Sequence, residues 1–232
     1  MLNLKSLLKP ARATLDETIK NPDCTELEVN KWIVSDFVTG KLLPIIKNRP
    51  FPLDEQMLLV SAICLSKPDI IFDWGTHIGK SARIFYETTK YFGITADIHS
   101  MDLPDDAEHA EHPGETRGML VRGLDNVYLH QSDGVDTALK LCKKTRAKRP
   151  FFYVDGDHSY ESVHRELTKI LKNTVSPAIV LHDTFYQSKG SNYNIGPSQA
   201  IKDVLKETKK KPTIITTQLG LPGMTFLYFK ES

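Results

Sequence analysis

The sequence is poor in cysteine and has no long apolar run. It contains three cysteines, at positions 24, 64 and 142, and no C-x-x-C pair. An odd number of cysteines without paired spacing does not suit a disulfide framework and is typical of a reducing compartment. No stretch approaches the roughly 20 apolar residues of a membrane-spanning helix, and the N-terminal stretch lacks the apolar core of a signal peptide. We therefore expect a cytoplasmic protein.

The sequence also lacks a strong charge of either sign. It has 30 Lys and Arg residues against 29 Asp and Glu residues, a net charge of +1. This balance provides no field that would attract nucleic acid or an anionic membrane, so we expect neither as a partner. The basic residues between 143 and 149 are interpreted as the solvated end of a helix, where positive charge is favourable.

Hydrophobic residues make up 40% of the chain and charged residues 25%, the balance of a soluble protein with a buried core. Residues 48–52, N-R-P-F-P, are the best candidate for a linker. We therefore expect an N-terminal helical extension over residues 1–50 and a main domain over residues 51–232. In the extension, Thr25 is placed to cap a helix that ends near Gly40.

The chain is organised around residues 69–82, D-I-I-F-D-W-G-T-H-I-G-K-S-A. An apolar run too short for a helix predicts a buried strand that Asp73 closes, and Gly75 and Gly79 lead into a helix. A strand, a glycine loop and a helix in this order let backbone N–H groups approach a ligand closely. The G-x-x-x-G loop differs from the G-x-G-x-x-G of dinucleotide enzymes, and a plain turn would use glycine too.

Strands and helices alternate through the rest of the chain. Further strands are expected at residues 97–101, 127–131, 151–154, 178–181, 213–217 and 225–229, most of them separated by helices. This pattern predicts an α/β fold: a Rossmann-like, doubly wound, mostly parallel seven-stranded sheet with a C-terminal antiparallel hairpin, plus N-terminal helices. An acidic loop with His109 and His112 follows the second strand, and a short helix is expected to end near Gly123. We interpret the loop as a lid in preference to a second metal site.

Polar residues stand where strand after strand ends. In open α/β sheets, ligands bind at the carboxyl ends of the strands. Several acids on one rim of a sheet repel one another, so a cationic ligand, a metal or both would explain them. The residues concerned are Asp73, Asp102, Ser132, Asp133, Asp155, His182 and Asp183.

Four short blocks of sequence contain most of these residues, and in their order along the chain they resemble class I S-adenosylmethionine (SAM)-dependent methyltransferases. They are D-x-G-T-x-x-G-x-S from Asp73, the strand ending in Asp102, Ser132–Asp133, and D-G-D-H-S-Y from Asp155. The last block, followed by H-D-T at residues 182–184, looks most like the small-molecule O-methyltransferase branch that includes cephalosporin-hydroxylase-like proteins. The resemblance begins near Leu53. Trp74 departs from the usual aliphatic residue, and either narrows the cofactor pocket or packs beneath the sheet.

The resemblance implies a set of SAM-binding residues. The loop after the first strand would wrap the methionine moiety, and Asp102 would accept hydrogen bonds from the ribose hydroxyls. Ser132 and Asp133 would meet the adenine edge. Asp102 also suits a turn, and Asp133 also suits a helix N-cap. The residues implied for the methionine moiety are Asp73, Gly75, Thr76, Gly79 and Ser81.

The resemblance also implies a metal site and a general base. Asp155, His182 and Asp183 match three ligands for a divalent cation, Mg²⁺ or, because His182 replaces a commoner carboxylate, Mn²⁺. Without a metal, His182 would be the partner of the two acids. His158 stands where relatives keep a base, and an imidazole with a pKa of ~6.5 accepts a proton near neutrality. Asp155 would share the catalytic role, and His158 also suits a helix-start histidine bonded to backbone.

The leading interpretation is an O-methyltransferase for a hydroxyl of a small molecule, a sugar or a natural-product intermediate, in a chain that can form a homo-oligomer. The aromatic residues Phe185, Tyr186 and Tyr193 would form a wall of the acceptor site. Two alternatives stay open: a non-catalytic SAM-binding protein and an NAD-dependent oxidoreductase. The second shares the fold but would lack its usual glycine pattern.

Overall fold

The computed structural model describes residues 31–108, 111–186, 193–217 and 219–229. None of the helices in these ranges is long and apolar enough to cross a membrane. The elements follow one another as α1 (Lys31–Phe37), η3 (Val38–Leu42), α2 (Leu43–Ile46), α3 (Leu53–Ser66), β1 (Ile70–Trp74), α4 (Lys80–Tyr91), β2 (Asp97–Asp102), η4 (Gly114–Thr116), β3 (Val127–Gln131), α5 (Gly134–Thr145), β4 (Pro150–Val154), α6 (Tyr160–Asn173), β5 (Ala178–His182), α7 (Gly196–Glu207), β6 (Thr213–Thr216) and β7 (Met224–Tyr228).

The strands form one seven-stranded sheet in the order β3-β2-β1-β4-β5-β7-β6. The strands from β1 to β5 run parallel, with Ile70 of β1 paired to Asp97 of β2 and Pro150 of β4. β7 lies antiparallel between β5 and β6. The predicted fold, including the C-terminal antiparallel hairpin, is confirmed. The strand order reverses beside β1, so β1 and β4 diverge at the point where such sheets bind ligands.

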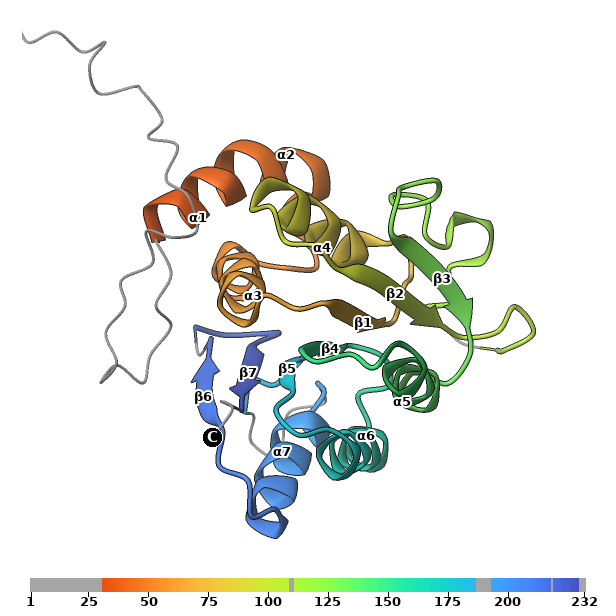
Figure 1. Cartoon of the computed structure of the whole chain (residues 1–232), viewed down its shortest axis with the longest axis vertical. Helices are drawn as coiled ribbons and strands as arrows, with labels where there is room; N and C mark the ends of the chain where they lie inside the picture. Colours follow the sequence, from red (N-terminus) through yellow and green to blue (C-terminus); the bar gives the residue numbers. More distant parts are fainter. Residues whose placement is uncertain (1–30, 109–110, 187–192, 218, 230–232) are drawn as a thin grey trace, which may run out of the picture.

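Helices cover both faces of the sheet (Figure 1): α3 and α4, with α1 and α2, lie over one face, and α5, α6 and α7 lie over the other. Successive residues of β1 point to opposite faces. Ile71 packs into the hydrophobic cluster that contains Phe85 of α4. Ile70 and Phe72 pack into the cluster that contains Leu167 of α6. Both faces of β1 are therefore buried, as expected of a central parallel strand.

Residues 31–46 form one helical run of α1, the π-helical η3 and α2. Gly40 lies inside η3, so the prediction that a helix ends near Gly40 is wrong. Val38 and Leu42 on either side of it are fully buried, and their packing outweighs the weak helix propensity of one glycine. Thr25 lies outside the described residues. The domain boundary near residue 50 stays a prediction, and Val34 joins the same hydrophobic cluster as α3 and α4.

The segment between β2 and β3 is irregular in its described part. It holds the short 3₁₀-helix η4 and turns instead of the predicted helix that would end near Gly123. Gly118 and Gly123 have φ angles of +64° and +78°, whereas an α-helix requires negative φ at every residue. His109 lies outside the described residues.

Candidate functional site

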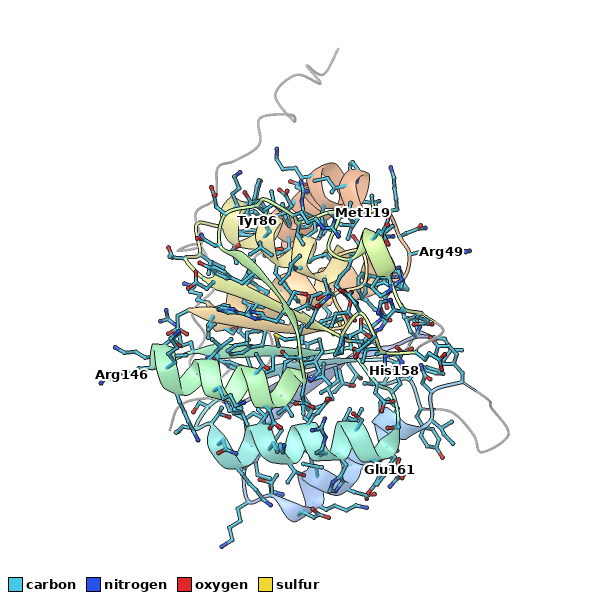
Figure 2. All side chains as sticks on the ribbon, turned by 90° about the vertical axis from the view of Figure 1, so that its right-hand side faces the viewer. Arg49, Tyr86, Met119, Arg146, His158 and Glu161 are labelled. Atoms are coloured by element: carbon cyan, nitrogen blue, oxygen red, sulfur yellow. The ribbon has the colours of Figure 1, made fainter. Side chains whose placement is uncertain are left out.

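The candidate residues lie at the end of the sheet where the parallel strands terminate. Figure 2 shows His158, which follows β4, at one end of the sheet and Arg146, which follows α5, at the other. The basic residues of 143–149 therefore begin at the opposite end from the candidate site.

The loop after β1 is held close to β2 and to the irregular segment that follows β2. Gly75, at φ +80°, donates its N–H to the carbonyl oxygen of Met101 over 2.9 Å. Thr76 is buried and its hydroxyl lies 2.7 Å from that of Ser100. Gly79, at φ +91°, is the residue before α4, and a Cβ there would come 3.0 Å from Val121. The two predicted loop glycines therefore occupy positions that a larger residue cannot fill without strain.

Asp73 is fully buried at the end of β1, and Ser100 donates a 2.5 Å hydrogen bond to its Oδ2. Burial raises the pKa of Asp73 to about 8, and the hydroxyls of Ser100 and Ser81 lower it only partly. Asp155 and Asp102 add to the increase. The predicted residues Asp73 and Ser81 thus lie together beneath the loop.

Asp102 closes β2 and orders the backbone around it. Its Oδ2 accepts the N–H of His77 and its Oδ1 accepts the N–H of Leu103, both over 2.8 Å. The guanidinium Nε of Arg117 lies 3.5 Å from Oδ2. Each carboxylate oxygen has two lone pairs, so each keeps acceptor capacity beyond its backbone bond. The turn role and the proposed ribose role are compatible.

Arg117 is a site residue that the sequence reasoning missed. Its side chain is 7% exposed and also contacts Asp105, the carbonyl oxygen of Leu103 at 2.9 Å and Nε2 of His112 at 3.1 Å. His112 therefore faces a cation, which argues against the second metal site weighed for this loop. Nothing in the residue pattern singles out one arginine in an irregular segment, because its partners come from the loop's own fold.

A cavity of about 710 Å³ opens beside this arginine, at the edge strand β3. It is distinct from the β4–β5 end of the sheet, where Asp155 and His182 lie. Its lining combines cations and acids from the irregular segment with the end of β3: Asp105, His112, Gly114, Glu115, Arg117, Arg122, Leu129, His130 and Gln131.

Ser132 and Asp133 follow β3 as predicted. The Ser132 hydroxyl lies 2.8 Å from that of Thr137. Asp133 is the N-cap of α5: its side chain accepts the N–H of Asp136 over 2.9 Å and an N–H of Arg165 over 2.9 Å. Although burial raises the pKa of Asp133, these partners hold it below its usual range. The N-cap interpretation is confirmed, and the adenine role stays a prediction.

The structure brings the three predicted metal ligands together. One ligand atom from each of Asp155, His182 and Asp183 lies within 4.8 Å of the others. Nδ1 of His182 is 3.0 Å from Oδ1 of Asp155 and 3.1 Å from Oδ2 of Asp183. Asp183 has φ +55°, a left-handed conformation uncommon outside glycine and typical of constrained sites. Asp155 also accepts the hydroxyl of Tyr153 over 3.0 Å.

Glu55 of α3 is a second residue that the sequence reasoning missed. It is 2% exposed, and its Oε2 lies 2.9 Å from Nε2 of His182. Burial lowers the pKa of His182, but the carboxylates of Asp155, Asp183 and Glu55 outweigh it and raise that pKa well above its usual value. An acid within an apolar helix was the available signal, because burying a carboxylate is costly without a partner.

His158 lies between the same acids. Its Nε2 is 3.3 Å from Oδ1 of Asp155 and 3.2 Å from Oδ2 of Asp183, and its Nδ1 is 2.9 Å from the side-chain amide of Asn194. Burial lowers the pKa of His158, but the two acids raise it overall. Its partners are side chains, so the backbone-bonded interpretation does not fit this geometry.

Aromatic side chains border the acids. Tyr193 donates its hydroxyl to Asp183 over 2.6 Å, and the ring of Phe51 packs edge-on to that of His182 with centroids 5.2 Å apart. Tyr186 is 61% exposed, and the ammonium group of Lys202 lies over its ring, 4.2 Å from the ring centroid. Tyr193 is thus at the candidate site, whereas Tyr186 faces outward.

Trp74 packs beneath the sheet. It is 3% exposed and lies in the hydrophobic cluster under α5 and α6, edge-on to Phe152. A Cβ at Gly134 would come 2.6 Å from its ring, so that glycine makes room for the indole. The packing interpretation of Trp74 is therefore the correct one.

Neither a family model nor a curated protein matches the chain, but solved structures do. The SAH-bound methyltransferase PaMTH1 of Podospora anserina has a TM-score of 0.55 at 16% identity, over 93% of this chain and 92% of its own. An O-methyltransferase from Bacillus cereus in complex with SAH has a TM-score of 0.53 at 16% identity, over 98% of this chain and 95% of its own. CalS11, a TDP-rhamnose 3'-O-methyltransferase, has a TM-score of 0.53 at 14% identity, over 94% of this chain and 99% of its own.

The chain shares the Rossmann-like fold of these solved structures. This fold is the one that the resemblance implied. In this fold, the candidate residues form two adjoining groups, one around the glycine loop and Asp102, the other around Asp155 and His182. The roles of the individual residues stay predictions.

Proposed function

We propose that the protein is a SAM-dependent O-methyltransferase that methylates a hydroxyl group of a small molecule, a sugar or a natural-product intermediate. One observation carries the proposal: the glycine loop after β1 packs directly against Asp155, so the two groups share one rim. The fold shared with SAH-bound methyltransferases supports a cofactor at that loop. A sugar acceptor is supported by CalS11, whose substrate is TDP-rhamnose.

The cofactor would lie along the ends of β1, β2 and β3. Asp102 would accept the ribose hydroxyls, because its oxygens keep lone pairs after bonding the N–H groups of His77 and Leu103. Gly75, Thr76 and Gly79 would line the methionine moiety, with Asp73 and Ser81 beneath them. Ser132 and Asp133 would meet the adenine.

Methyl transfer forms a carbon–oxygen bond as the carbon–sulfur bond breaks, and the electron pair of that bond passes to sulfur. The acceptor hydroxyl must then lose its proton. His158 would take this proton on its imidazole, and the carboxylates of Asp155 and Asp183, 3.3 and 3.2 Å from Nε2, would stabilise the imidazolium that forms. Alignment of the acceptor oxygen with the methyl group would account for much of the rate.

A divalent metal fits the donor set. Two carboxylate oxygens and an imidazole nitrogen converge within 4.8 Å, and these atom types are metal ligands in proteins. Asp155, His182 and Asp183 would hold Mg²⁺ or Mn²⁺. Such an ion would act as a Lewis acid that lowers the pKa of an acceptor hydroxyl.

Calorimetry of the full chain with SAH, and with NADH as the comparison, tests the cofactor. We expect SAH to bind and NADH not to bind; the reverse would identify an oxidoreductase. Transfer of a labelled methyl group from SAM to a panel of nucleotide sugars and phenols, with Mg²⁺ or Mn²⁺ present, tests the reaction. SAH binding without turnover of any acceptor would instead indicate a non-catalytic binding protein.

A further inference from the structure

Glu55 of α3 reaches the metal candidates from the far side of His182. Its two oxygens have separate partners. Oε2 lies 2.9 Å from Nε2 of His182, and Oε1 accepts the backbone N–H of Gly223 over 2.8 Å. Both the acid and the histidine are buried, at 2% and 4% exposure. The carboxylate is therefore fixed at both ends and cannot rotate away.

The imidazole of His182 is correspondingly fixed in direction. Its Nε2 points to Glu55, and its Nδ1 points to Asp155 and Asp183 at 3.0 and 3.1 Å. The edge-on ring of Phe51 restricts rotation of the imidazole. One nitrogen thus faces the candidate metal position and the other faces away from it.

A carboxylate is an acceptor of hydrogen bonds, so Nε2 of His182 carries a hydrogen toward Glu55. Nδ1 faces carboxylates too, so the metal-free imidazole carries a hydrogen on both nitrogens. A dication bound between Asp155 and Asp183 would replace the hydrogen on Nδ1 and leave the one on Nε2, which Glu55 holds. Metal-ligating histidines are commonly held in this way, with the second ring nitrogen donating to a carboxylate that fixes the tautomer.

We propose that Glu55 is a positioning residue that presents Nδ1 of His182 as a metal ligand, and that the site takes a transition-metal dication such as Mn²⁺ in preference to Mg²⁺. The inference rests on the proposed metal-assisted function. Imidazole nitrogen suits transition metals, whereas Mg²⁺ prefers a complete set of oxygen ligands.

The variant Glu55→Gln tests this role because it keeps the shape of the side chain. Gly223 still requires an acceptor, so the amide oxygen of the new side chain faces Gly223 and the amide NH₂ faces His182. The NH₂ donates to Nε2, which places the hydrogen of the neutral imidazole on Nδ1 and removes the metal-binding lone pair. Asp54→Asn, one position earlier on α3, makes the same change in charge and serves as the control.

The full chain would be titrated with Mn²⁺ and Mg²⁺, and the Mn²⁺ form examined by pulsed electron paramagnetic resonance for coupling to ¹⁴N. We expect ¹⁴N coupling in the unmodified protein and in Asp54→Asn, and Mn²⁺ binding tighter than Mg²⁺ binding. Glu55→Gln should lose the coupling and bind Mn²⁺ about 10- to 100-fold more weakly. His182→Asn should lose the coupling as well, which assigns the nitrogen to His182.

Mn²⁺ binding without ¹⁴N coupling, or Glu55→Gln with unchanged coupling and affinity, would overturn the proposal. Absence of Mn²⁺ binding in the unmodified protein would overturn it too and leave His182 as the partner of two acids. Calorimetry with SAH on the same samples separates these outcomes from failure of the proposed function. SAH binding that persists in every variant shows folded protein with an intact cofactor site.

Discussion

The carbonyl oxygen of Asp155 occupies the space that a side chain at Gly75 would need. This contact joins the end of β4 to the loop after β1, and it fixes the distance between the candidate cofactor loop and the acids. Gly75 also has φ +80°, which disfavours every residue except glycine. Two separate costs therefore oppose substitution at this position.

The variants Gly75→Ala and Gly93→Ala separate the two costs. Gly93 has φ +66° and open space around it, so Gly93→Ala incurs conformational strain alone, about 1–2 kcal/mol. Gly75→Ala adds a clash with backbone that cannot rotate away, for a total of about 2–5 kcal/mol. Urea unfolding measures both free energies. Equal losses in the two variants would show that the Asp155 contact carries no weight.

Asp102→Asn tests the ribose assignment. Removal of the charged acceptor should weaken SAH binding by about ten- to a hundredfold, the equivalent of roughly 1.5–3 kcal/mol. Asp97→Asn at the opposite end of β2 is the control, and its SAH affinity should be unchanged. Calorimetry with a circular dichroism check of folding provides the measurement. An unchanged affinity in folded Asp102→Asn would remove Asp102 from the cofactor site.

The parts of the fold that were predicted correctly depend on local pattern. Short apolar runs gave the strands, and glycines and acids at the strand ends gave the loop after β1 and the group around Asp155, because parallel strands bring their ends to one edge. The missed parts depend on contacts between distant residues. Glu55 meets His182 across 127 positions, and Arg117 reaches Asp102 from an irregular segment. The predicted helix end near Gly40 was wrong because burial of the neighbouring Val38 and Leu42 keeps the chain helical there.

Glu166 of α6 offers a test through pH. Burial raises its pKa from 4.5 to about 7, and the neighbouring Trp74 indole and Arg165 guanidinium lower it only in part. Below about pH 4.5 the folded and unfolded states are both protonated. Between about pH 4.5 and 7 the folded state keeps a proton that the unfolded state has lost, so the free energy of unfolding falls as pH rises.

Glu166→Gln should remove this fall and be more stable than the unmodified protein at pH 8 by about 1–3 kcal/mol, with little difference near pH 4. Glu161→Gln, an exposed position in the first turn of the same helix, should show no such gain. Urea unfolding across this pH range gives both differences. A Glu166→Gln variant that is less stable at pH 8 would show that the carboxylate is ionised and stabilising.

His158→Ala tests the general base. His158 contacts Asp155 and Asp183, away from the residues assigned to the cofactor, so SAH affinity should be retained. Loss of the proton acceptor should lower kcat by about 10²–10⁴. His164→Ala on α6 is the control, because His164 pairs with Glu207 and Tyr160 outside the site, and its kcat should match that of the unmodified protein. Single-turnover transfer from labelled SAM isolates the chemical step. A near-normal kcat in His158→Ala would make this histidine structural and assign deprotonation of the acceptor to the Asp155–Asp183 group.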